Sequence, residues 1–122
     1  MEEHKLSICS FNCQSVKSSL TEVYELCERS DLVLLQEHWL LPGELACLND
    51  IHKDFLSTGH SAVDVSKSVL VGRPYGGTAI LYRKDLAGRV STVETSDSRI
   101  TARITAVTFT STIGPVLIAY AM

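Results

Sequence analysis

The order of elements at the start of the chain restricts the fold more than any other feature of the sequence. Residues Lys5 to Asn12 alternate between apolar and polar side chains, which predicts a short strand. From Leu20 to Arg29 apolar side chains recur at helical spacing, and the continuous apolar run Leu32 to Leu35 is typical of a strand covered on both faces. A strand, a helix and a strand in this order form a right-handed crossover unit with two parallel strands.

The boundaries of the helices and loops in the first half come from shorter signals. Ser19 and Glu22 have the spacing of a capping box, in which both side chains satisfy free backbone amides at a helix start. A second helix is expected from Pro42 to Phe55. The small and polar residues from Ser57 to Gly72 indicate a loop with one short strand at Val69 to Val71.

The second half of the chain has the pattern of antiparallel strands. A strand is expected from Thr78 to Lys84, directly after the pair Gly76-Gly77. Side chains alternate strictly from Ile100 to Phe109, and the turn signal Gly114-Pro115 precedes an apolar strand from Val116 to Tyr120. Parallel strands in the first half of the sequence and antiparallel strands in the second half predict an α/β fold with a mixed sheet.

Two polar residues stand where the parallel strands end. Asn12 closes the first strand and Glu37 follows the second. In open α/β sheets the binding crevice lies beyond the carboxyl ends of the strands, so an amide and a carboxylate are expected together at that edge. The alternative is that Asn12 caps a turn and Glu37 is a solvated surface residue.

Length and charge limit the function further. The chain has 122 residues, enough for one modest core, so residues 1–122 are interpreted as one domain. The net charge of −3 is unevenly distributed. Residues 1–60 carry 4 Lys or Arg and 10 Asp or Glu, whereas residues 61–122 carry 7 Lys or Arg and 4 Asp or Glu. A protein that binds nucleic acid through a basic patch should be more positive than this.

The cysteines and the apolar runs bear on compartment. Neither a Cys-x-x-Cys pair nor a matching His pair is present, so a zinc site is not expected. The four cysteines give no sign that disulfides are needed, which fits a reducing compartment. No apolar run approaches the roughly 18 residues of a membrane span, and the start of the sequence lacks the pattern of a secretory signal. We therefore expect an intracellular protein that does not enter a membrane.

Four segments together resemble the motifs of the endonuclease/exonuclease/phosphatase superfamily. They are, in order, Ser10 to Gln14, Leu34 to Trp39, Gly76 to Ile80 and Ile118 to Tyr120. Each is weak alone, but all four occur in the family's order and approximate spacing. The wording Phe-Asn-Cys-Gln-Ser, Gln-Glu-His-Trp-Leu and Arg-Pro-Tyr-Gly-Gly is most similar to endonuclease domains of non-LTR (LINE-type) retrotransposons.

The resemblance implies a fold, an activity and three site residues. The fold would be the N-terminal half of a four-layer α/β sandwich, and the activity that of a DNA-nicking phosphodiesterase that uses Mg²⁺ or Mn²⁺. Glu37 would be the main metal ligand, with Asn12 holding a metal-bound water or the phosphate and Tyr120 bonding to the scissile phosphate. DNA would be the partner, and a retrotransposon endonuclease would work in the nucleus.

The remaining family motifs, an Asp-x-Asn pair, a later Asp and a terminal Ser/Asp-His, lie beyond the tyrosine strand and are not found here. We therefore expect a domain truncated before these motifs, with weak or no activity. The alternatives are a phosphatase of the same superfamily and a noncatalytic fragment or interaction module.

Several neighbours of the motifs are expected to be structural. Adjacent strand residues point to opposite faces, so His38 should be structural if Glu37 faces the site. Gly76 and Gly77 are expected to provide a turn with positive φ. Trp39 is expected in the core.

Overall fold

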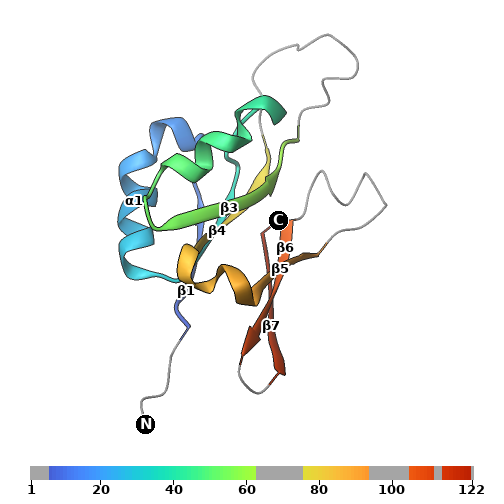
Figure 1. Ribbon diagram of the computed structural model, residues 1–122. Coiled ribbons are helices and arrows are strands. Elements are labelled where there is room, and N and C mark those ends of the chain that lie inside the picture. Colours follow the sequence, from blue (N-terminus) through green and yellow to red (C-terminus); the bar gives the residue numbers. More distant parts are fainter. Residues whose placement is uncertain (1–5, 63–75, 94–104, 112–113, 122) are drawn as a thin grey trace.

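The computed structural model describes residues 6–62, 76–93, 105–111 and 114–121, and for residues 111 and 114–121 it describes the backbone alone. Figure 1 shows the arrangement of the elements. In chain order they are strand β1 (Ile8–Asn12), 3₁₀ helix η1 (Val16–Ser18), helix α1 (Leu20–Arg29), β2 (Leu32–Gln36), 3₁₀ helix η2 (Pro42–Asp50), β3 (Phe55–His60), β4 (Thr78–Arg83), 3₁₀ helix η4 (Lys84–Arg89), β5 (Val90–Val93), β6 (Thr105–Ser111) and β7 (Gly114–Ala121).

The strands form two sheets, and the larger one is mixed as the sequence predicts. Its strand order is β1-β2-β4-β3, with β1 and β2 parallel and the other pairs antiparallel. The second sheet has the antiparallel order β5-β6-β7. None of the helices in the described ranges has the length and apolar character that crossing a membrane requires.

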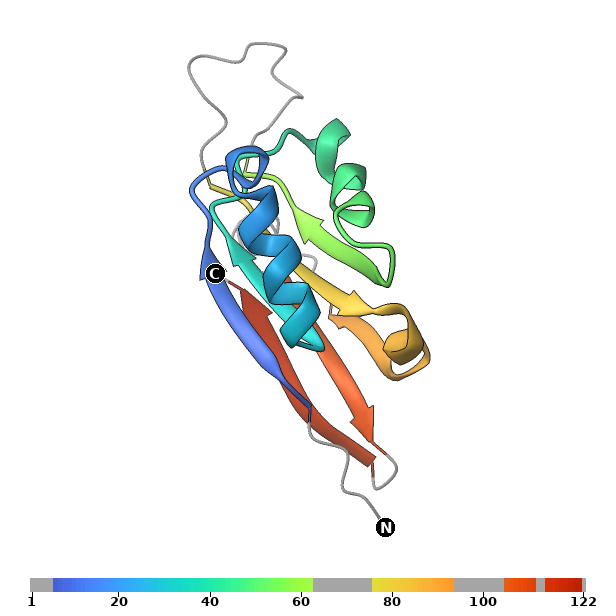
Figure 2. The same cartoon turned by 90° about the vertical axis from the view of Figure 1, so that its left-hand side faces the viewer.

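The inner strands of the four-stranded sheet, β2 and β4, are covered on both faces, which explains the continuous apolar run in β2. Val33 and Leu35 pack into a core with α1, η2 and β3, whereas Leu32 packs with Ile80 and Val107 between the two sheets. Figure 2 shows α1 across one face of the sheet, with β6 and β7 on the other side. Complete burial of such a side chain stabilises the fold by about 1.5–3 kcal/mol.

Helix α1 begins where the sequence predicts, but the predicted capping box is not formed. The Ser19 hydroxyl donates instead to the carbonyl oxygen of Cys13 at 3.0 Å, and this bond closes the loop after β1. The reciprocal half of such a motif occurs in η2, where the Glu44 carboxylate accepts the Leu41 N–H at 2.9 Å.

The prediction for residues 42–72 is wrong in part. The expected helix is a 3₁₀ helix that ends at Asp50, and Phe55 begins β3 instead of closing the helix. Ser57 to His60, expected in a loop, form the rest of β3. Within the described ranges this edge strand pairs with β4 alone, so its small and polar residues need no alternating pattern. The short strand expected at 69–71 lies outside the described residues.

The end of the chain differs from the prediction in one respect. Gly114 and Pro115, expected in a turn, are the first residues of β7 and pair with Ser111 and Thr110. Proline is tolerated at the first positions of an edge strand, where its missing N–H costs little. Of the strand expected at 100–109, the described part begins at Thr105.

Candidate active site

The carboxyl ends of β1 and β2 lie side by side. Asn12 is the register partner of Gln36. The parallel ladder continues past both strands, because the Cys13 N–H donates to the Gln36 carbonyl at 3.0 Å and the Ser15 N–H donates to the Glu37 carbonyl at 2.9 Å. Asn12 and Glu37 therefore stand at the same edge of the sheet, the arrangement that the sequence predicts from two parallel strands.

Glu37 is held in a left-handed backbone conformation, with φ +60°. Its N–H donates to the carbonyl of Gly77 at 2.8 Å, and the N–H of Trp39, whose φ is +58°, donates to the carbonyl of Gly76 at 2.9 Å. For a residue with a Cβ this conformation costs on the order of 1–3 kcal/mol. The segment after β2 thus keeps two strained residues because the glycine pair holds their amides.

Gly76 and Gly77 provide backbone geometry, as expected. Their φ values are +83° and +92°, in the region that glycine adopts freely. A Cβ on Gly77 would lie 2.2 Å from Cε1 of His38, so the position also requires the absence of a side chain. The glycine pair therefore lets the start of β4 approach the segment that carries Glu37.

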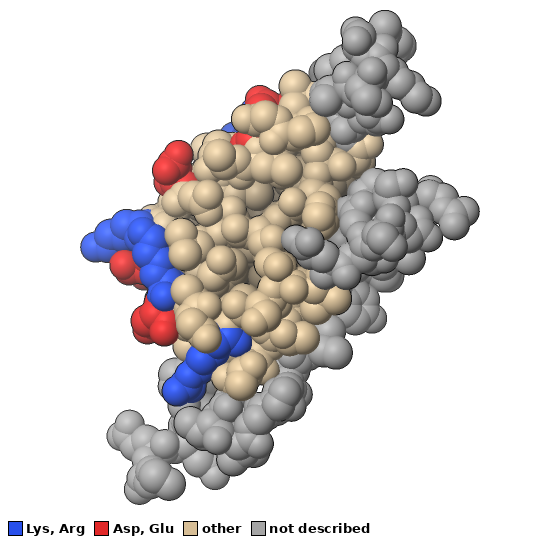
Figure 3. Space-filling view, turned by 45° about the vertical axis from the view of Figure 1, so that its right-hand side comes forward, with Lys and Arg blue, Asp and Glu red and all other residues tan. Residues whose placement is uncertain are grey.

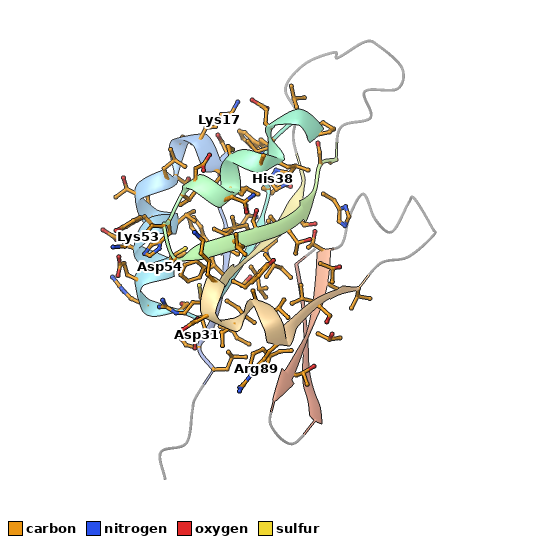
Figure 4. All side chains as sticks on the ribbon, viewed as in Figure 1. Lys17, Asp31, His38, Lys53, Asp54 and Arg89 are labelled. Atoms are coloured by element: carbon orange, nitrogen blue, oxygen red, sulfur yellow. The ribbon has the colours of Figure 1, made fainter. Side chains whose placement is uncertain are left out.

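His38 is a structural residue in this arrangement. The side chain is fully buried, its Nδ1 accepts the Leu40 N–H at 2.9 Å, and its Nε2 donates to the His60 carbonyl at 2.8 Å. Burial lowers the pKa of the imidazole from its ordinary value, so the ring is neutral near pH 7. Figure 4 shows His38 at the end of the sheet that lies next to η2.

The Glu37 carboxylate has a partner that sequence reasoning missed. The indole Nε1–H of Trp39 donates to Glu37 Oε2 at 2.7 Å, and both side chains are half-buried. The expectation that Trp39 belongs to the core is wrong, because it lies at the border of the site. The sequence shows that the chain's single tryptophan stands two residues after the glutamate, which alone does not predict the bond.

A row of polar side chains crosses the sheet at the same end. Register partners share a face of the sheet, and Asn12, Gln36 and Thr78 are successive partners. Thr78 Oγ1 lies 2.8 Å from Oγ1 of Thr105 on β6, so this face is the one directed toward the second sheet. The Ser10 hydroxyl donates to Gln36 Oε1 at 3.2 Å, which adds a second residue that the sequence did not single out.

The backbone of Tyr120 reaches the same end of the molecule. Tyr120 pairs with Ala106 on β6, next to Thr105. Thr105 also donates to the carbonyl of Thr78 at 3.0 Å, and Thr78 is the register partner of Gln36. The side chain of Tyr120 lies outside the described part of the structure, so its role stays a prediction.

The oxygen donors at this edge fit a hard divalent cation. Within the described residues no three His, Cys, Asp or Glu side chains are grouped so that they could hold a metal ion. Mg²⁺ keeps most of its waters and binds proteins through one or two carboxylates, so one carboxylate beside an amide suits it. Cys13 follows Asn12 in the ladder, and its thiol is buried. Burial raises the pKa of this thiol to about 11, which makes it a poor metal ligand.

Charged side chains are absent from much of one face. Figure 3 shows a broad area of the described residues without Lys, Arg, Asp or Glu, and charges gathered along one rim. Lys17 at the end of η1 is paired with Glu44 of η2. The described part of the face in Figure 3 therefore offers few cationic side chains for contacts with phosphate groups.

Comparison with known proteins identifies the family of the chain. The Endonuclease/Exonuclease/phosphatase family matches residues 9–120. No match was found among curated proteins.

Solved structures with the same fold include nucleases. An AP endonuclease from Archaeoglobus fulgidus is similar with a TM-score of 0.60 and 17% identity, over 86% of this chain and 37% of that one. For the AP endonuclease of Leishmania major the TM-score is 0.54 and the identity 14%, over 86% of this chain and 35% of that one. For a 3′ phosphatase from Neisseria bound to a product DNA hairpin the TM-score is 0.53 and the identity 18%, over 88% of this chain and 38% of that one. The chain thus spans little more than a third of their length, and the likeness is one of fold.

Proposed function

Because this chain belongs to the Endonuclease/Exonuclease/phosphatase family, we propose that it carries the cation-binding part of a divalent-metal-dependent phosphodiesterase that acts on DNA. The observation that carries this proposal is the continued parallel ladder, in which Ser15 N–H bonds to the Glu37 carbonyl at 2.9 Å. That ladder keeps an amide and a carboxylate at one edge, where open α/β folds bind ligands.

Three residues of this chain have separate roles in the proposed reaction. Glu37 supplies the carboxylate for Mg²⁺ or Mn²⁺, and Asn12 supplies an amide that bonds to a water of the ion or to the phosphate. Tyr120 contributes a hydroxyl that donates to the scissile phosphate. A bound cation would polarise a phosphoryl oxygen and stabilise the negative charge that develops there.

DNA is the substrate that the similar structures favour. Two of them are AP endonucleases, and a third is a 3′ phosphatase bound to a DNA hairpin. The wording of the motifs around Asn12 and Glu37 favours a LINE-type retrotransposon endonuclease, which would nick duplex DNA in the nucleus. The phosphatase in the comparison supports a second candidate, removal of a terminal phosphate, which would use the same carboxylate and cation.

We further propose that these 122 residues hold an incomplete active site. The chain spans 37% of the similar Archaeoglobus fulgidus endonuclease, and the family motifs that lie beyond the tyrosine strand are not found in it. A general base contributes about 10²- to 10⁴-fold in rate. The expected activity of this chain alone is therefore very weak or absent.

Two measurements on the chain test these proposals separately. The first is the midpoint of thermal unfolding with and without Mg²⁺ or Mn²⁺, since a ligand that binds only the folded state raises the midpoint. We expect a rise that is lost in Glu37→Gln and kept in Glu25→Gln, a control on the exposed side of α1. An equal rise in Glu37→Gln would overturn the assignment of the site.

The second measurement is nicking of supercoiled plasmid in the presence of Mg²⁺. We expect little or no nicking above a protein-free control. Robust nicking that Glu37→Ala abolishes would show that the site is complete, and would contradict the proposal of weak activity while supporting the site. Release of phosphate from a 3′-phosphorylated oligonucleotide, without nicking, would favour the phosphatase.

A further inference from the structure

The hydrogen bond between Trp39 and Glu37 joins the candidate metal ligand to the chain's single tryptophan. The indole N–H can only donate, and it occupies Oε2 at 2.7 Å. Among the described residues no other side chain or backbone donor bonds to this carboxylate. One carboxylate oxygen is therefore fixed by the indole, and Oε1 is left for another partner.

The backbone around this pair is built so that the two side chains can meet. Glu37 and Trp39 both have left-handed φ values, +60° and +58°, and two hydrogen bonds to the carbonyls of Gly77 and Gly76 hold them there. Between them, His38 is buried and bonded through both ring nitrogens. Three consecutive residues are thus held in place by separate contacts, and the carboxylate and the indole lie at the half-buried border of the site.

We infer that Trp39 is a positioning residue for Glu37, whose indole N–H orients the carboxylate so that Oε1 faces a divalent cation. This inference rests on the proposed function, because it takes Glu37 as the ligand. Partners that bond to a metal ligand fix its orientation, and their loss typically weakens metal affinity about 10- to 100-fold. The alternative is that the same bond only stabilises the loop after β2.

The single tryptophan makes the inference measurable in the unaltered protein. Its emission reports the surroundings of the indole that bonds to Glu37. If the carboxylate takes up a cation, Mg²⁺ should shift the emission of Trp39 with a saturable dependence on concentration. Paramagnetic Mn²⁺ should quench the same emission over its own binding range, and both effects should be absent in Glu37→Gln.

The variant that removes the bond is Trp39→Phe, which keeps an aromatic ring and lacks the N–H. Tyr24→Phe is the control, because it removes an aromatic polar hydrogen beside another glutamate, Glu28, on α1. Mn²⁺ affinity is measured from the EPR signal of the free ion, which needs neither tryptophan nor activity. We expect Trp39→Phe to bind Mn²⁺ about 10- to 100-fold more weakly and Tyr24→Phe to bind like wild type.

The outcomes separate this inference from the proposed function. Unchanged Mn²⁺ affinity in Trp39→Phe, with binding lost in Glu37→Gln, would overturn the positioning role and leave the metal site intact. Unchanged affinity in Glu37→Gln would overturn the metal site itself. If Trp39→Phe does not fold, the wild-type emission decides: a saturable response to Mg²⁺ that Glu37→Gln removes supports the inference, and its absence contradicts it.

Discussion

The hydroxyl oxygens of Thr78 and Thr105 lie 2.8 Å apart in the space between the two sheets. Thr105 also donates to the carbonyl of Thr78 at 3.0 Å, and both side chains are buried. This contact ties β4 to β6 at the end of the sheet where Asn12 and Glu37 stand. It links the core between the sheets to the candidate site and leads to the first prediction.

Replacing Thr105 with Val should destabilise the fold by about 1–3 kcal/mol, because it leaves the buried Thr78 hydroxyl and carbonyl without this partner. The shape of the side chain is nearly unchanged, so the loss reports the hydrogen bonds. Urea unfolding of Thr105→Val against the exposed control Thr92→Val measures it. Equal stability of the two variants would show that the contact contributes nothing.

Of the glycines whose surroundings the structure describes, Gly77 is the one whose replacement should cost most. Alanine there would combine a strained φ of +92° with a Cβ that lies 2.2 Å from the buried His38 ring. Strain and overpacking together predict a loss of about 2–4 kcal/mol in the free energy of unfolding. Gly43→Ala is the matched control, since a Cβ at Gly43 has no neighbour within 4 Å. A loss of the same size in both variants would contradict this explanation.

The burial of His38 predicts a specific dependence of stability on pH. Its pKa is lowered from the ordinary value of 6.5 in the folded state, chiefly by desolvation. Below pH 6.5 the unfolded chain therefore binds a proton that the folded chain does not, so this contribution to stability is present above that pH and is lost as pH falls toward the folded-state pKa.

The free energy of unfolding, measured from pH 8 to pH 5, and an NMR titration of the His38 ring check this together. We expect stability to fall below pH 6.5 and the folded ring to titrate below that value. A ring that titrates at or above 6.5 would contradict the buried, neutral imidazole.

The sequence predicts the crossover unit well because each of its elements has a strong local pattern. The run Leu32 to Leu35 packs on both faces, and α1 buries Val23 and Cys27 at helical spacing. Strand β3 was missed because Ser57 to His60 lie at an edge, where pairing with β4 replaces the alternating signal.

The site was predictable only in its backbone layout. Parallel strands bring Asn12 and Glu37 to one edge, and that follows from the order of elements alone. The bond from Trp39 to Glu37 depends on left-handed φ values at both residues, and the backbone preferences of Glu and Trp do not predict them. The place of Gln36 in the polar row required the register between β1, β2 and β4.

The most direct test of the account is whether one Mn²⁺ ion lies near both strand ends. Paramagnetic broadening of NMR signals falls steeply with distance, so Mn²⁺ well below one equivalent should first broaden the side-chain amide of Asn12 and the indole N–H of Trp39. The amide of Asn49, which bonds to Ser57 on β3, serves as the internal comparison. We predict selective broadening in wild type and none in Glu37→Gln; equal broadening in both proteins, or none in wild type, would contradict a shared cation site.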